Sequence, residues 1–207
     1  MPEEGIPLIP HKEILTYEEL LRIIRIFAEE GISKVRLTGG EPLVRKGIVD
    51  FIAHISEIKE IQDLSLTTNG ILLKEYAQDL KRAGLKRVNI SLDSLNKERF
   101  CQITRRDDFE KVWAGIEEAI KAGLSPIKIN MVAIQGLNDD EIESFARLTF
   151  RLPLTVRYIE YMPSGNGKEW RESDLFTIPQ IKTHLERVGN LIPIPTDRWD
   201  GPAKRFQ

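Results

Sequence analysis

The sequence predicts an α/β fold in which parallel strands form an incomplete (β/α) barrel of the TIM type, with helices on its outside. Five short segments with the period of a strand alternate with segments that have the period of an amphipathic helix. Strands that are separated by helices run parallel, with right-handed crossovers. Each strand segment also alternates apolar and polar residues, whereas parallel strands covered on both faces are continuously apolar. We therefore expect one face of the sheet to pack against helices and the other to line a polar lumen.

The helices are indicated by capping residues and by the spacing of apolar residues. After a loop over residues 1–15, Thr16 and Glu19 match a capping box that begins a helix reaching Glu30, and Gly31 ends it. The other helical patterns cover residues 47–60, 74–83, 108–122, 139–150 and 178–188, with a helical turn over 96–100.

The strands are placed by their alternation and by the glycines and polar residues that end them. The five segments are residues 35–38, 64–69, 88–93, 127–134 and 156–162. We expect residues 1–190 to form the partial barrel core. Residues 191–207, rich in proline, are expected to be the extended start of a C-terminal region.

The polar face of these strands carries several charged groups. Its members are Arg36, Thr38, Ser65, Thr67, Asn69, Asn89, Ser91, Asp93, Lys128, Asn130 and Arg157. A structural barrel core is filled by bulky branched residues, and burying unpaired cations is costly. A wet lumen that holds a polar, anionic ligand would explain this composition. The alternative is that one face of the sheet is simply solvated.

The first strand ends at Gly39, Gly40, Glu41 and Pro42. Glycines let a ligand approach the main chain without a Cβ in the way, and Pro42 keeps Glu41 out of the helical region. Small-molecule sites in parallel α/β folds lie at this end of the strands. The alternative is that the two glycines only close a tight turn.

Composition and charge exclude several classes of protein. The chain is 41% hydrophobic and 30% charged with a net charge of −2, so no overall field attracts nucleic acid or membrane. No apolar run is long enough to span a bilayer, and we see no signal peptide. Cys101 is the single cysteine, which excludes an internal disulfide or a cysteine-built metal site and predicts a cytoplasmic protein. The histidines, His11, His54 and His184, lack the spacing of metal ligands.

Four segments together resemble the radical S-adenosylmethionine (SAM) superfamily and, more closely, its GTP 3′,8-cyclase family of molybdenum-cofactor biosynthesis. They are Arg36–Leu43, Leu66–Gly70, Val88–Asp93 and Arg157–Met162. The opening run Met1–Gly5 is similar to the segment that follows the last cysteine of the family's CxxxCxxC motif. The resemblance covers essentially the whole chain.

This resemblance implies roles for nine residues. Gly39, Gly40 and Glu41 match the segment that takes the methionine amino group of SAM, and Ser91 and Met162 match contacts to the rest of that cofactor. Arg36, Thr67 and Lys128 match positions that hold GTP, with Arg157 alongside. The four substrate positions belong to the polar face described above, so the two arguments agree. No catalytic side chain is assigned.

The sequence also departs from the family. Its CxxxCxxC motif and its second group of cysteines are absent, and Cys101 matches neither, so ligands of the [4Fe-4S] clusters would lie outside this chain. We therefore expect an internal fragment, inactive by itself, of an enzyme with SAM and [4Fe-4S] clusters as cofactors.

The implied reaction is that of a lyase that converts GTP to 3′,8-cyclo-7,8-dihydro-GTP, the first step of molybdopterin biosynthesis. The product would pass to a cyclic pyranopterin synthase, and the electron donor is left open. Two alternatives remain, a peptide-modifying radical SAM maturase and a non-catalytic module that binds SAM or a nucleotide. Lys128 and Arg157, beside Arg36, favour a triphosphate over a peptide.

Overall fold

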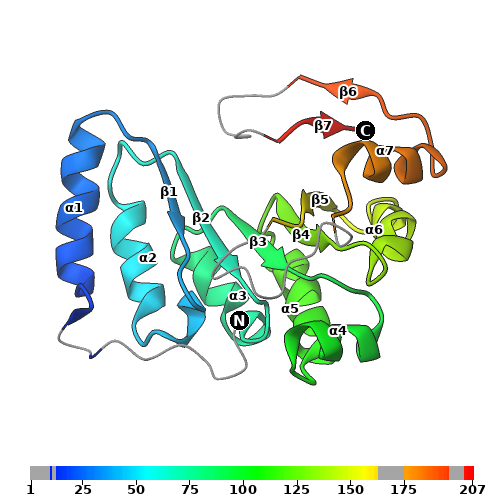
Figure 1. Ribbon diagram of the computed structural model, residues 1–207. Coiled ribbons are helices and arrows are strands. Elements are labelled where there is room, and N and C mark those ends of the chain that lie inside the picture. Colours follow the sequence, from blue (N-terminus) through cyan, green and yellow to red (C-terminus); the bar gives the residue numbers. More distant parts are fainter. Residues whose placement is uncertain (1–9, 11–12, 163–174, 196–202) are drawn as a thin grey trace.

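The computed structural model describes residues 10, 13–162, 175–195 and 203–207 of the 207-residue chain. The run Met1–Gly5 and His11 lie outside these residues. Within them, five strands form one parallel sheet in the order of the sequence. They are β1 (Lys34–Leu37), β2 (Asp63–Thr68), β3 (Arg87–Ser91), β4 (Ile127–Ala133) and β5 (Leu154–Glu160). This confirms the predicted parallel α/β array, and Figure 1 shows the strands following one another across the molecule from β1 to β5.

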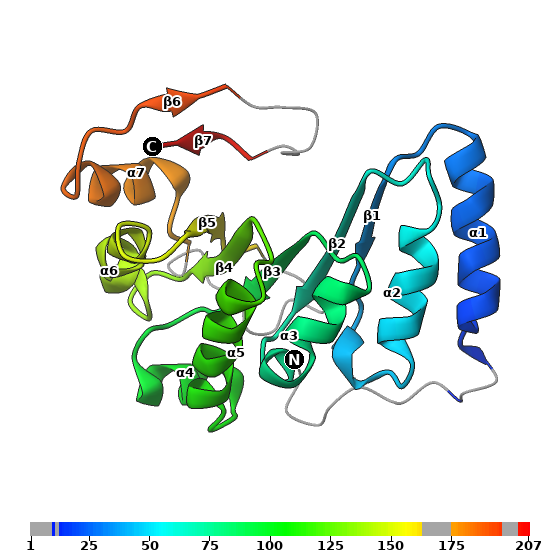
Figure 2. The same ribbon diagram turned by 180° about the vertical axis from the view of Figure 1, so that it is seen from behind.

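Helices separate the strands, as predicted. They are α1 (Tyr17–Glu29), α2 (Ile48–Ser56), α3 (Leu73–Arg82), α4 (Lys97–Thr104), α5 (Phe109–Lys121), α6 (Ile142–Leu148) and α7 (Ile178–Glu186), with 3-10 turns η2 (Pro42–Val44) and η3 (Asp139–Glu141). Seen from behind in Figure 2, α1, α2, α3 and α5 stand side by side along the sheet.

Several helix ends follow from local hydrogen bonds. The predicted capping box begins α1, because Thr16 Oγ1 accepts from the N–H of Glu19 and Glu19 Oε2 accepts from the N–H of Thr16. The helix α2 ends at Ser56, earlier than predicted, where the Ser56 hydroxyl donates to the Ala53 carbonyl. The predicted helical turn after β3 is instead the two-turn helix α4, capped by the Asn96 side chain.

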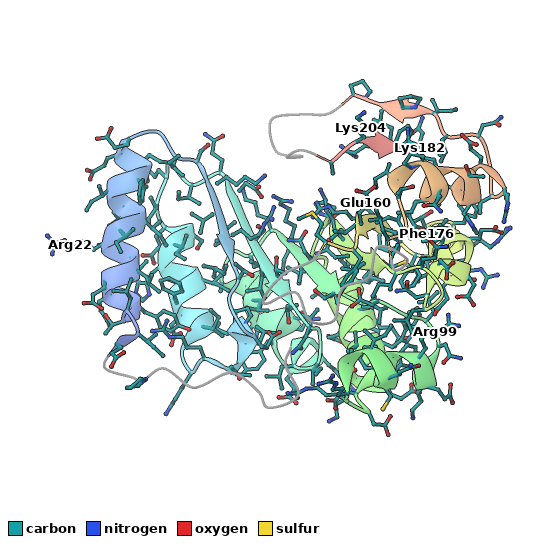
Figure 3. All side chains as sticks on the ribbon, in the orientation of Figure 1. Arg22, Arg99, Glu160, Phe176, Lys182 and Lys204 are labelled. Atoms are coloured by element: carbon teal, nitrogen blue, oxygen red, sulfur yellow. The ribbon has the colours of Figure 1, made fainter. Side chains whose placement is uncertain are left out.

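The predicted alternation separates the two faces of the sheet. The apolar strand residues join the helices in one core cluster, in which Leu66, Val88 and Ile129 are fully buried. On the outer side of α1, Arg22 points away from the sheet (Figure 3). The polar strand residues occupy the other face, which is the face that we expected to line the lumen.

The tail predicted to be extended contains two short strands in its described residues. Two short strands, β6 (Pro193–Ile194) and β7 (Arg205–Phe206), pair antiparallel above α7. The ammonium of Lys182 on α7 lies 4.8 Å from the centre of the Phe206 ring, which ties the pair to the helix (Figure 3). Glu160, at the end of β5, accepts from the N–H of Ile178, so α7 is fixed to the sheet. The boundary predicted between residues 190 and 191 stays a prediction.

Candidate functional site

The turn after β1 leaves open space beside its main chain. Gly39 has φ +146°, in the region that favours glycine, whereas Gly40 does not require such a conformation. A Cβ placed on either glycine would have no atom of the described residues within 4 Å. Packing therefore leaves room for a ligand to approach this main chain, and the choice between a ligand site and a simple turn stays a prediction.

Glu41 connects this turn to the end of β2. Its Oε1 accepts from the hydroxyl of Thr68 at 2.8 Å and from the N–H of Leu43 at 3.1 Å. Its Oε2 accepts from the N–H of Asn69 at 2.6 Å. Both carboxylate oxygens thus have protein donors, and Glu41 holds the loop of Gly39 and Gly40 against the neighbouring strand.

The strand register arranges the polar face in rows. Arg36, Ser65 and Arg87 form one row. The second row, nearer the carboxyl ends of the strands, contains Thr67, Asn89, Lys128 and Thr155. Ser91, Asn130 and Arg157 form a third. The three cations predicted to bind phosphate therefore lie in three successive rows, and only Thr67 and Lys128 of the predicted substrate residues share one.

The predicted site residues differ in exposure. Arg36 and Ser91 are exposed, Thr67 and Arg157 are half-buried, and Lys128 is only 8% exposed. Arg157 donates to Asn130 Oδ1 at 3.3 Å. Met162, beyond the end of β5, is 71% exposed and makes no part of the core. The described residues thus place a buried lysine between two more accessible arginines, at a face that ends beside the open glycine turn.

A buried ion pair at the amino-terminal end of this face was missed by the sequence reasoning. Arg87 donates to both carboxylate oxygens of Asp63, at 2.7 and 2.5 Å, and Lys34 lies 3.8 Å from the same group. The signal was present, since Asp63 and Arg87 each extend the alternating pattern by one polar residue. The amino-terminal end of the face is therefore occupied by a buried ion pair in which the charges of Asp63 and Arg87 compensate each other.

Two further carboxylates, Glu141 and the polar-face residue Asp93, organise the loops after β3 and β4 in roles that the sequence did not indicate. Glu141 accepts from the hydroxyl of Ser94 and from the N–H of Leu95, and it pairs with Arg99 (labelled in Figure 3). Asp93 Oδ1 accepts from the N–H of Val132 at 2.8 Å, and burial raises the pKa of the Asp93 carboxyl. The carboxyl ends of these strands are therefore held by two acids, the buried Glu141 and the half-buried Asp93, as Glu41 holds β1 to β2.

The residues present fit SAM better than they fit an iron–sulfur cluster. The space beside Gly39 and Gly40 would accept a methionine moiety against exposed main chain. In contrast, the part of the chain that the structure describes contains no group of three His, Cys, Asp or Glu side chains able to hold a metal ion. Cys101 lies on α4 as a partly buried free thiol. A [4Fe-4S] cluster, which is held by cysteine thiolates, does not fit these residues.

An open pocket of about 370 Å³ lies apart from the predicted site residues. Its walls are mainly apolar and are formed by Leu95, Phe109, Glu110, Trp113 and Leu148, from the helices and the loop after β3. None of the predicted site residues lines it.

No helix in the described ranges has the length and apolarity needed to cross a membrane.

Comparisons with known proteins identify the family of this chain. The model of the Radical SAM superfamily matches residues 4–149. The chain is 52% identical over 207 residues to the GTP 3′,8-cyclase of Alkaliphilus oremlandii and 50% identical over 208 residues to that of Thermodesulfovibrio yellowstonii. Both alignments cover 100% of this chain but only 63% and 64% of those relatives.

Solved structures share the fold at low identity. A radical SAM methyltransferase from Sphaerobacter thermophilus has a TM-score of 0.64 at 19% identity, covering 84% of this chain and 55% of that structure. Methylornithine synthase also has a TM-score of 0.64, at 15% identity, with 84% and 53% covered. These structures extend well beyond the part that is matched.

Proposed function

Because this chain belongs to the radical SAM superfamily, we propose that it forms the central barrel portion of a GTP 3′,8-cyclase, the lyase that converts GTP to 3′,8-cyclo-7,8-dihydro-GTP in molybdopterin biosynthesis. The observation that carries this proposal is an identity of 50–52% to proteins of that name along the entire chain. The match to the Radical SAM superfamily model supports it, and so does the polar face of the sheet with its cations.

SAM would be held at the carboxyl end of the sheet. In this proposal the main chain of Gly39 and Gly40 receives the methionine amino group, and Ser91 and Met162 contact the remainder. When bound, SAM supplies the group that removes a hydrogen atom from the substrate. Glu41 keeps the glycine loop in position through its contacts to Thr68 and Asn69. Its own contact with SAM stays a prediction.

GTP would lie on the polar face, with its phosphates near Arg36, Lys128 and Arg157 and with Thr67 as a further contact. The role of these side chains is to bind and orient the nucleotide and to exclude water from it. Three cations on successive rows suit an extended triphosphate better than an uncharged peptide. This favours the cyclase over the alternative of a peptide-modifying enzyme.

The chain itself would act as the binding portion of the enzyme. Its single cysteine cannot supply the thiolates that a [4Fe-4S] cluster requires, so cluster ligands must come from residues other than these 207. We further propose that the reaction is cytoplasmic, that residues 191–207 begin the C-terminal region, and that a cyclic pyranopterin synthase consumes the product.

The test is a chimera in which these 207 residues replace the matching 63% of the Alkaliphilus oremlandii relative. We expect the chimera to bind GTP and SAM and to form the cyclic product. The isolated chain, reconstituted with iron and sulfide, should give no 5′-deoxyadenosine above a no-protein control. A folded chimera that binds SAM but not GTP would contradict the proposed substrate. Formation of 5′-deoxyadenosine by the isolated chain would contradict its role as a binding portion.

A further inference from the structure

Asn89 lies in the middle of the polar face and has a buried atom without a partner. Its side chain is 1% exposed, and its register partners are Thr67 on β2 and Lys128 on β4. Among the buried side-chain nitrogens and oxygens of the described residues, Asn89 Oδ1 stands alone in having no hydrogen bond. Buried polar atoms are nearly always paired, so such an atom requires a physical explanation.

The orientation of the Asn89 amide is fixed by its neighbours on β2. Its Nδ2 donates to the Leu66 carbonyl at 3.3 Å and to Thr67 Oγ1 at 3.4 Å. Because a carbonyl can only accept, the nitrogen must face β2 and the oxygen cannot exchange places with it. Asn89 Oδ1 therefore faces away from β2, on the face that bears Lys128.

We propose that Asn89 Oδ1 accepts a hydrogen bond from a ribose hydroxyl of the bound nucleotide. This inference rests on the proposed function, in which the polar face binds a nucleoside triphosphate. An ionised phosphate has no hydrogen to donate, so Asn89 Oδ1 cannot be a phosphate contact. The ribose hydroxyls are the donors closest to the phosphate chain, and Asn89 shares its row with two of the residues proposed to hold the nucleotide.

Asn89 would consequently be a specificity residue. A buried acceptor built for a hydroxyl is left unpaired when the ligand lacks that group, which penalises the analogue without it. We therefore expect the site to prefer a ribonucleotide to the corresponding deoxyribonucleotide at the position that Asn89 contacts.

The experiment compares Asn89→Leu with the unsubstituted chimera described above, using GTP, 2′-deoxy-GTP and 3′-deoxy-GTP. One hydrogen bond corresponds to about a three- to tenfold change in affinity. We expect the unsubstituted protein to bind one of the two analogues more weakly than GTP by about this factor. Asn89→Leu should weaken GTP by a similar factor, and it should change affinity for that same analogue by less than about twofold.

Asn130→Leu is the matched control, because Asn130 is an asparagine on the same face whose Oδ1 already accepts from Arg157. It should weaken all three nucleotides equally. An equal loss for all three in Asn89→Leu would mean that Asn89 acts through Lys128 or the fold, and no loss for any would mean that Asn89 Oδ1 binds water only. Either result overturns the proposal.

Asn89→Ser serves as a second variant if the leucine variant does not fold. The comparison of the three nucleotides in the unsubstituted chimera needs no variant, and equal affinities there also overturn the inference. Failure of that chimera to bind GTP would instead reject the proposed function.

Discussion

At the scale of single residues, Glu41 shows how one carboxylate can fix the geometry of a binding loop. Three donors converge on it, from Leu43 in its own turn and from Thr68 and Asn69 at the end of β2. The sequence indicated that Glu41 would stand beside a ligand. It could not indicate that both oxygens would be used by the protein, because the two contacts on β2 come from residues far along the chain.

Glu41→Gln should therefore loosen the turn. A glutamine must present its NH2 to one of the donors, so at least one hydrogen bond to a charged acceptor is lost and a donor is left unpaired. We expect a loss of about 2 kcal/mol in the free energy of unfolding, together with weaker SAM binding in the chimera. Thr68→Val should also lower the thermal midpoint, because it removes the contact to Glu41 and leaves the buried N–H of Gly70 without the Thr68 Oγ1 acceptor. A thermal midpoint unchanged by Glu41→Gln would show that the carboxylate does not hold the loop.

Asp93 gives a prediction about pH. Burial raises its pKa in the folded state, so over the pH range from its unfolded value up to that raised value the folded protein binds more protons than the unfolded one. The free energy of unfolding should fall as pH rises through this range, and the loss persists above it. Asp93→Asn keeps an acceptor for the N–H of Val132 and removes the charge.

The variant should therefore be more stable than the natural protein at pH 7, and the difference should shrink as the pH approaches 4. Thermal midpoints measured between pH 4 and pH 7 test this, with Asp50→Asn on the exposed side of α2 as the control. A difference that grows toward acid pH would mean that the ionised Asp93 stabilises the fold.

At the scale of elements, alternation was the informative signal. The apolar and polar faces of the strands were predictable because a period of two residues assigns each side chain to a face. The pairing of β6 with β7 was not predictable, because each strand has only two residues and carries no period. The length of α4 was underestimated, since its cap and its end at Arg105, with φ +59°, depend on local geometry.

Two glycines with opposite roles provide a test at this scale. A Cβ on Gly115, in α5, would lie 2.5 Å from the carbonyl oxygen of Gly70, a backbone atom that cannot easily move. Alanine favours a helix over glycine by about 1 kcal/mol, but overpacking costs about 1–3 kcal/mol. We therefore expect Gly115→Ala to lower the thermal midpoint.

Gly40→Val should have the opposite effect in the chimera, with little change in stability and a loss of SAM affinity. A valine side chain there meets no described atom within 4 Å at its Cβ, so stability should change little, while SAM affinity should fall because the side chain occupies the ligand's space. Unchanged SAM affinity would show that Gly40 only closes the turn and does not contact SAM. If Gly115→Ala were as stable as the natural protein, α5 would not be pressed against the turn after β2.

At the scale of the whole molecule, the order of the strands was predictable and the alignment of their side chains was not. Helices between strands require parallel crossovers, which restricts the topology to few arrangements. The rows of the polar face depend on strand register, which no single strand encodes. This is why Arg36, Lys128 and Arg157 could be assigned to one face but not to successive rows, and why Asn89 was not recognised between Thr67 and Lys128.

The charges of this face give the last prediction. Lys128 is buried at 8% exposure between rows that hold Arg36 and Arg157. A charge pair at about 4 Å is worth roughly 1 kcal/mol in bulk water and roughly 4 kcal/mol at an effective dielectric constant near 20. A partly enclosed face lies between these limits, so Lys128→Ala should weaken GTP binding by about ten- to a few hundred-fold in the chimera.

Lys128→Ala should lower GTP affinity far more than it changes the thermal midpoint of the empty protein, because it removes a charge that attracts the phosphates and also relieves repulsion between neighbouring cations. This contrast distinguishes a lysine that binds substrate from one that holds the fold. The measurement pairs GTP affinity with the thermal midpoint, and Lys121→Ala on the exposed side of α5 controls for the loss of one positive charge. A midpoint that drops by several degrees while GTP affinity holds would make Lys128 a structural residue, and the phosphate site would then have to be sought around Arg36 and Arg157 alone.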